Sequence, residues 1–191
     1  MRVTKDPQIR KQEILETAMT LFEQNGIGKT SMSDIAKEAN VTKGLVYYYF
    51  SSKDELVEAV VALFVRDTNQ RLQQIVEGSS LTFYEKLLQI MTLYFVTIQE
   101  HLKFVEASPA NAGIYELIKN SLSESALVQT KDFIKQATEE GILTIDYPEY
   151  TLKILINGIA DLYLEGVHNP KIFATLIEQT LALPKGSLQL K

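Results

Sequence analysis

Apolar residues recur every three or four positions along most of this 191-residue chain, which is the spacing of an amphipathic α-helix. No segment shows a convincing alternation of apolar and polar positions, which a half-buried strand would require. All five prolines lie between the helical segments or at their starts, where proline is tolerated. The pattern therefore predicts an all-α protein of about nine helices.

Polar caps and glycine-containing breaks separate the predicted helices. Ser31 and Asp34 have the spacing of a capping box, and so do Ser52 and Glu55. One segment, 82–102, is apolar almost all round, so we expect other helices to surround it. The nine predicted helices are 7–25, 31–39, 42–50, 52–76, 82–102, 111–119, 121–140, 148–167 and 170–183.

The short segments 31–39 and 42–50 indicate a helix-turn-helix. Each is too short to be stable alone, so both must pack on the helices before and after them. Asn40 can adopt the left-handed conformation that the tight turn between them demands. The second helix would bury Val46 and Phe50, which are one turn apart, and expose a lysine, a glycine and tyrosines. Such a surface suits the phosphates and base edges of DNA.

The positions around this motif form a longer pattern. It reads Ile14-Leu15-x-x-Ala18-x-x-Leu21-Phe22-x-x-x-Gly26, then Thr30-Ser31-x-x-x-Ile35-Ala36-x-x-Ala39-x-Val41-x-Lys43-Gly44-x-Val46-Tyr47-x-Tyr49-Phe50-x-x-Lys53-x-x-Leu56. In these residues the chain resembles the tetracycline-repressor (TetR) family of bacterial transcription regulators. Asn40 and Tyr49 depart from the residues usual in that family, which are glycine and histidine. The resemblance implies a DNA-binding domain at 8–68, followed by a domain at 69–191 that binds an effector and dimerises.

Nine residues of the first domain are candidates for contact with DNA. Helix capping explains Thr30, Ser31 and Thr42 without any DNA, and a solvated surface lysine is the simplest alternative for Lys43. Val46 and Phe50 already fill the buried face of their helix, so we expect at least one of the three consecutive tyrosines on a phosphate. The candidates are Thr30, Ser31, Thr42, Lys43, Gly44, Tyr47, Tyr48, Tyr49 and Lys53.

The second predicted domain carries more apolar side chains than one core requires, which predicts a ligand pocket and a dimer interface. Any single one of them is more often a core residue, and Asn157 is more simply a solvent-facing or interface residue. The candidates for binding an apolar or amphipathic small molecule are Met91, Tyr94, Phe95, Ile98, Tyr115, Phe133, Asn157 and Tyr163. The candidates for a four-helix interface between two copies are Ile156, Ile159, Tyr163, Phe173, Leu176 and Ile177.

Charge and composition narrow the function further. The net charge is −5, but residues 1–53 hold eight basic and six acidic side chains, a balance of +2, and this asymmetry favours nucleic acid as a partner of the first part. The chain has no cysteine, which excludes disulfides, thiolate zinc sites and cysteine nucleophiles. Its two histidines, His101 and His168, lack a partner at helical ligand spacing, so we expect no metal, no cofactor and no enzymatic activity.

Together these features predict a homodimeric repressor that binds a palindromic operator in double-stranded DNA and leaves it when a small effector binds. The polar start of the chain is unlike a signal peptide, and no apolar run reaches the ~20 residues of a membrane span. We therefore expect a bacterial cytoplasmic protein, associated with the nucleoid when bound and with no membrane contact. The alternative is an all-helical protein–protein interaction module without DNA binding. An enzyme is a third class, for which the sequence offers no converging ionisable groups.

Overall fold

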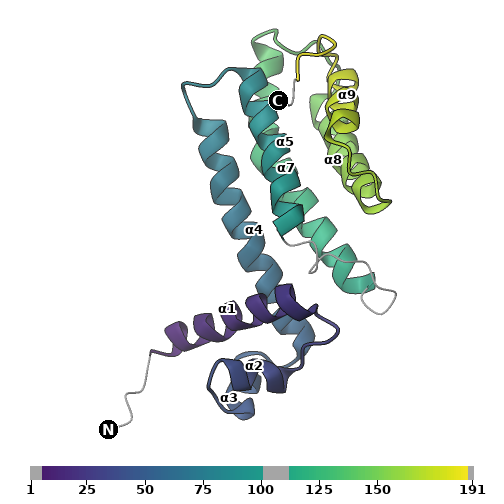
Figure 1. Cartoon of the computed structure of the whole chain (residues 1–191). Coiled ribbons are helices and arrows are strands. Elements are labelled where there is room, and N and C mark those ends of the chain that lie inside the picture. Colours follow the sequence, from purple (N-terminus) through teal and green to yellow (C-terminus); the bar gives the residue numbers. More distant parts are fainter. Residues whose placement is uncertain (1–5, 101–111, 189–191) are drawn as a thin grey trace. The chain divides into compact units, whose positions relative to one another are not determined.

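The computed structural model describes residues 6–100 and 112–188, without the side chains of 98–100, 112, 114 and 115. All regular structure in these ranges is helical, which confirms the predicted all-α class. None of the described helices is long and apolar enough to cross a membrane. Figure 1 labels the helices, which are α1 (Pro7–Asn25), α2 (Met32–Glu38), α3 (Lys43–Tyr49), α4 (Lys53–Glu77), α5 (Phe83–Glu100), α7 (Ala112–Glu139), α8 (Pro148–Leu164) and α9 (Pro170–Thr180).

The structure corrects one element of the pattern. Residues 112–139 form the single helix α7, which joins the segments predicted as separate helices at 111–119 and 121–140. The described ranges hold eight helices. Asn120 and Ser121 resemble the start of a new helix, since both residue types favour caps. Their side chains are exposed or half-exposed here, and no proline or glycine follows before Gly141. The helix therefore continues through them at a small cost in propensity.

The chain divides into two compact units. One consists of Met1–Phe64 with Ile98–Ile118, and the other of Val65–Thr97 with Lys119–Lys191. Helix α4 contributes residues to both units. The domain boundary expected at residues 68 and 69 stays a prediction.

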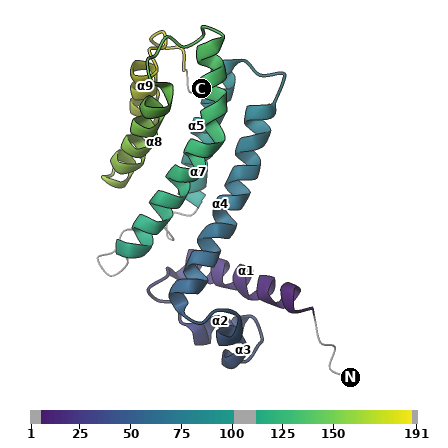
Figure 2. The same cartoon turned by 180° about the vertical axis from the view of Figure 1, so that it is seen from behind.

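The first unit has a core built by its short helices together with α1 and the start of α4. Ile14 and Phe22 of α1, Ile35 of α2, Val46 of α3 and Leu56 of α4 are all fully buried. Helices α2 and α3 lie side by side next to α1 in Figures 1 and 2. Each is too short to persist without this packing.

The turn between α2 and α3 has the predicted geometry. Asn40 has φ 52°, in the left-handed region, which asparagine tolerates better than most residues do. The N–H of Val41 donates to the carbonyl of Ala36 at 2.9 Å, which closes the end of α2. This turn fixes the direction in which α3 leaves α2.

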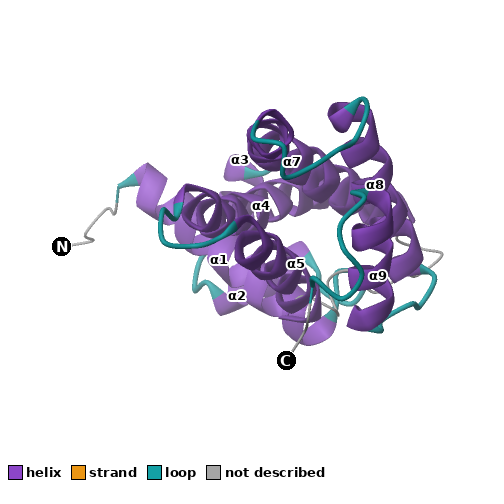
Figure 3. Cartoon of the chain, turned by 90° about the horizontal axis from the view of Figure 1, so that it is seen from above, coloured by secondary structure: helices purple, strands orange, loops and turns teal. Residues whose placement is uncertain are grey.

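The second unit is a helical bundle with one continuous core. Helices α8 and α9 pack against each other and lie side by side in Figures 1 and 3. Two ion pairs join α7 to α8, Lys119 with Asp161 at 3.1 Å and Lys131 with Glu149 at 3.0 Å. The earlier lysine of α7 pairs with the later acidic residue of α8, and the later lysine with the earlier one, so the two helices run antiparallel. The core includes Leu72, Met91, Phe133, Leu155, Ile177 and Leu181.

Candidate nucleic-acid interface

Helix α3 presents most of its polar and aromatic side chains to solvent because its apolar side is used for packing. Val46 and Phe50 are almost completely buried. Of the tyrosines between them, Tyr47 is 44% exposed and Tyr48 78% exposed, whereas Tyr49 is half-buried. The ring of Tyr48 packs edge-on against that of Tyr49, with centroids 5.1 Å apart. The expectation that Val46 and Phe50 fill the buried face of α3 is confirmed.

Side-chain caps fix the starts of α2 and α3. The capping box predicted from the sequence is present at α2. Ser31 donates from its backbone N–H and its hydroxyl to the Asp34 carboxylate, at 2.9 and 2.6 Å. These bonds, that of the Ser31 hydroxyl foremost, lower the pKa of Asp34. At α3 the hydroxyl of Thr42 accepts from the N–H of Leu45 at 3.2 Å. The oxygens of Ser31 and Thr42 are therefore engaged in capping.

A hollow of about 310 Å³ lies where the α1–α2 loop meets the starts of α2 and α3. Five of the nine sequence candidates for DNA contact line it, and it also contains Lys29 and Ser33, which the sequence analysis missed. A basic residue in a loop directly before a capping box is the signal that could have found Lys29. The lining residues are Gly28, Lys29, Thr30, Ser31, Met32, Ser33, Lys43, Tyr47 and Lys53.

Two of these candidates have structural roles within the unit. Thr30 is only 2% exposed, and its hydroxyl donates to the carbonyls of Gly26 at 3.0 Å and Leu21 at 3.3 Å. Its side chain closes the turn after α1, and its contact with DNA stays a prediction. The ammonium group of Lys53 donates to the carbonyl of Ile27 at 2.5 Å. Lys53 thus ties the first turn of α4 to the α1–α2 loop and keeps its charge beside the hollow.

Aromatic rings position two further lysines of this unit. The Lys43 ammonium lies 5.8 Å from the centre of the Tyr47 ring, one turn further along α3. The Lys11 ammonium lies 5.3 Å from the centre of the Phe50 ring. Both distances are in the range of cation–π attraction. The Lys43 charge is therefore held against the exposed surface of α3.

Gly44 has no structural explanation within the unit. It lies in the first turn of α3, and its φ angle is not positive. A Cβ added at this position would meet nothing within 4 Å. Gly44 therefore leaves open space on the exposed surface of α3, which we call the gap at Gly44.

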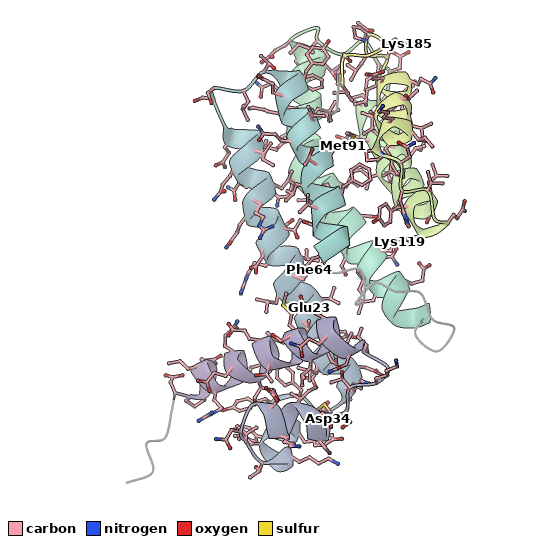
Figure 4. All side chains as sticks on the ribbon, in the orientation of Figure 1. Glu23, Asp34, Phe64, Met91, Lys119 and Lys185 are labelled. Carbon is pink, nitrogen blue, oxygen red and sulfur yellow. The ribbon has the colours of Figure 1, made fainter. Side chains whose placement is uncertain are left out.

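Those candidate effector residues whose side chains are described all belong to the second unit. Met91 and Phe133 are in the core, and Figure 4 labels Met91 on α5. The ring of Phe95 is 6.1 Å from that of Tyr163. Asn157 donates to the carbonyl of Lys153 in its own helix, at 2.8 Å. The side chains of Ile98 and Tyr115 lie outside the described residues.

Two buried hydroxyls of α5 have no hydrogen-bond partner among the residues that the structure describes. They belong to Tyr94, which the sequence analysis named, and to Thr97, which it did not. Thr97 is 2% exposed, and burial raises the pKa of the Tyr94 phenol. A buried hydroxyl without a partner is costly. The sequence does not show whether a buried threonine hydroxyl will lack a partner or will donate a hydrogen bond to a carbonyl of its own helix.

The residues that were expected at the dimer interface differ in how far they are exposed. Phe173 and Ile177 of α9, with Tyr163 of α8, are buried in the core of this unit. Their side chains pack within this unit, and the expected interface stays a prediction. Ile156, Ile159 and Leu176 are half-buried. Large side chains are exposed on the other face of α8, where Tyr150 is 70% and Ile154 71% exposed. Tyr147, the residue before this helix, is 75% exposed.

Comparison with known proteins gives the family. A family model described as "Bacterial regulatory proteins, tetR family" matches residues 14–60. The repressor KstR2 of Mycolicibacterium smegmatis is 33% identical over 155 residues, which are 81% of this chain and 67% of that protein. The uncharacterised regulator YuxN of Bacillus subtilis is 32% identical over 80% of this chain, and the match spans about half (53%) of its own length.

The fold is also that of solved regulators. The structure of a complex of SmeT with triclosan superposes with a TM-score of 0.65 at 19% identity, and the match covers 96% of this chain and 99% of that one. The described helices, the capped helix-turn-helix and the similarity to KstR2 agree with one another. The chain therefore belongs to the tetR family of bacterial regulatory proteins.

Proposed function

We propose that the protein is a homodimeric transcriptional regulator, acting as a repressor in the bacterial cytoplasm. It binds a palindromic operator in double-stranded DNA through α3 and leaves it when a small apolar or amphipathic effector binds. The observation that carries this proposal is the exposed face of α3 with Lys43, Gly44, Tyr47 and Tyr48, next to a hollow lined by lysines.

Phosphate contacts would position the protein on the duplex. Lys29 and Lys43 line the hollow, and Tyr47 holds the Lys43 ammonium at the surface. Ammonium groups and hydroxyls are common phosphate ligands. With this hollow against the backbone, α3 enters the major groove, which is wide enough to admit a helix.

The effector site lies among the aromatic residues of the second unit. Rings of Phe95, Tyr163 and Phe173 lie within 5.1 to 6.4 Å of one another, and they suit an apolar ligand. The orphaned hydroxyls of Tyr94 and Thr97 would gain partners from a polar group on that ligand. The structural neighbour SmeT was solved as a complex with triclosan, an example of this kind of molecule. Helix α4 belongs to both units and links them covalently.

A second copy would cover the exposed face of α8. Tyr150 and Ile154 share that face one turn apart and leave large apolar surfaces in water. The ring of Tyr147, the residue before α8, lies 6.4 Å from that of Tyr150. Gly158 continues the same face, and a Cβ there would meet nothing within 4 Å. Because Gly158 has no side chain and free space around its Cα, the backbone of another helix can approach closely there. In a two-fold dimer the same patch serves both subunits.

Titration of the full chain with duplex DNA at two salt concentrations tests the proposal. Phosphate contacts predict affinity that falls steeply between ~50 and ~200 mM salt. Addition of an apolar ligand that binds the protein should then release the DNA. Failure to bind any duplex at low salt would contradict the proposal and favour a protein–protein interaction module. Tight ligand binding that leaves DNA affinity unchanged would contradict the effector mechanism alone.

A further inference from the structure

The recognition surface of α3 has an unusual chemistry for a helix that reads bases. In the major groove, arginine and lysine pair with guanine, asparagine and glutamine with adenine, and acidic side chains with cytosine, whereas apolar groups contact the thymine methyl. Helix α3 contains Lys43 but no arginine, amide or carboxylate side chain. Of these polar readers, α3 therefore has only the lysine.

The hydroxyls next to α3 are already engaged in the protein's own caps. The Thr42 hydroxyl caps α3, so its methyl group is the part that is free to touch a base. After the helix, the Ser51 hydroxyl donates to Glu55 at 2.6 Å, and that of Ser52 accepts from the N–H of Glu55 at 3.1 Å. Reading by these hydroxyls would break a cap.

Lys43 is placed for a phosphate. Its ammonium is held over the Tyr47 ring, and both residues line the same hollow as Lys29. A lysine in this position contributes to affinity for any sequence. It leaves the discrimination between bases to the remaining exposed residues of α3.

Gly44 and Tyr48 form the remaining part of that surface, and they are one turn apart on the same face of α3. The Tyr48 ring is 78% exposed, and the edge-on contact with Tyr49 restricts its orientation. Gly44 leaves open space one turn before it, since an added Cβ would meet nothing within 4 Å. An exposed ring next to such a gap is complementary to the C5 methyl group of a thymine.

We infer that α3 reads its half-site mainly through thymine methyl groups, with Tyr48 and the gap at Gly44 as the specificity-determining elements. The inference rests on the proposed function, in which α3 lies in the major groove. It names the class of operator that this surface recognises, namely half-sites with thymine at the positions facing Tyr48 and Gly44.

Replacement of thymine by deoxyuridine tests the inference, because it removes the methyl group and leaves base pairing unchanged. The full chain is first used to select an operator from random duplex DNA. Each thymine of the half-site is then replaced symmetrically, and affinity is measured by fluorescence anisotropy at one salt concentration. Loss of one buried methyl should weaken binding about fourfold per half-site, since such a group is worth about 0.8 kcal/mol.

Protein variants identify the reader. Tyr48→Ala should abolish the difference between the thymine and deoxyuridine operators, whereas Tyr48→Phe should keep it. Lys43→Ala is the matched control, since it should weaken binding to both operators equally. Equal affinity for thymine and deoxyuridine at every position of a selected operator would overturn the inference and leave the proposed function standing. If no operator can be selected, the proposed function fails and the inference fails with it.

Discussion

Replacement of Gly44 by alanine should change stability and DNA binding in opposite directions. Gly44 occupies the second position of α3 without a positive φ, and an added Cβ meets nothing within 4 Å. Alanine is therefore compatible with the native backbone and restricts the unfolded chain. Such replacements stabilise proteins by about 0.4–1 kcal/mol. For a chain of this size, that corresponds to a rise in Tm of about 1–4 °C.

The effect on DNA binding follows from the space that the glycine leaves open. If a base edge approaches the Gly44 Cα, the added methyl group occupies the position of the DNA. Forcing one extra carbon into a close contact costs about 1–3 kcal/mol. Operator affinity should then fall about 5- to 150-fold per half-site. Circular dichroism melting and fluorescence anisotropy with a selected operator measure the two effects on the same preparation.

Gly113→Ala provides a matched control. Gly113 is also the second residue of its helix, α7, and a Cβ there would likewise meet nothing within 4 Å. It should raise Tm to a similar degree and leave operator affinity unchanged. If Gly44→Ala binds the operator as tightly as the wild type, DNA does not approach this part of α3 and the reasoning is refuted.

Three other predictions concern single features. Lys43→Ala and Tyr47→Phe should each weaken operator binding while thermal melting stays unchanged. The lysine change should cost about 1–3 kcal/mol per half-site. Anisotropy titrations that match the wild type would contradict the phosphate role of these residues. Ile154→Asp, on the exposed face of α8, should give a folded monomer in light scattering, and a dimer would exclude this face as the interface. The lowered pKa of Asp34 means that its carboxylate stabilises the fold above about pH 4 and loses this effect as the pH falls through the lowered value. The difference in Tm between the wild type and Asp34→Asn should therefore shrink in acid, and a difference independent of pH would contradict this.

Local sequence signals predicted the helix-turn-helix well. The capping residues Ser31 and Thr42, the left-handed Asn40 and the buried pair Val46 and Phe50 all depend on neighbours within a few positions. Short-range hydrogen bonds and helical spacing therefore determine this part of the fold. The caps, the turn and the buried pair of the helix-turn-helix can therefore be predicted from the sequence alone.

Features that depend on tertiary packing could not be predicted in the same way. Thr30 has the position of a cap residue, but its hydroxyl reaches the carbonyl of Leu21 in the preceding helix. Phe173 is apolar and so is Ile154, yet only packing decides that the first is fully buried and the second 71% exposed. Helical spacing shows that α8 has two apolar faces and does not show which of them faces the core.

The central claim is that α3, presented twice by a dimer, reads a symmetric site in duplex DNA. Selection of bound sequences from a random duplex library with the full chain tests it most directly. The account predicts a palindromic consensus whose two half-sites are separated by about one helical turn or a multiple of it, ~10 base pairs. Enrichment of no sequence, or of a consensus without two-fold symmetry, would contradict the account.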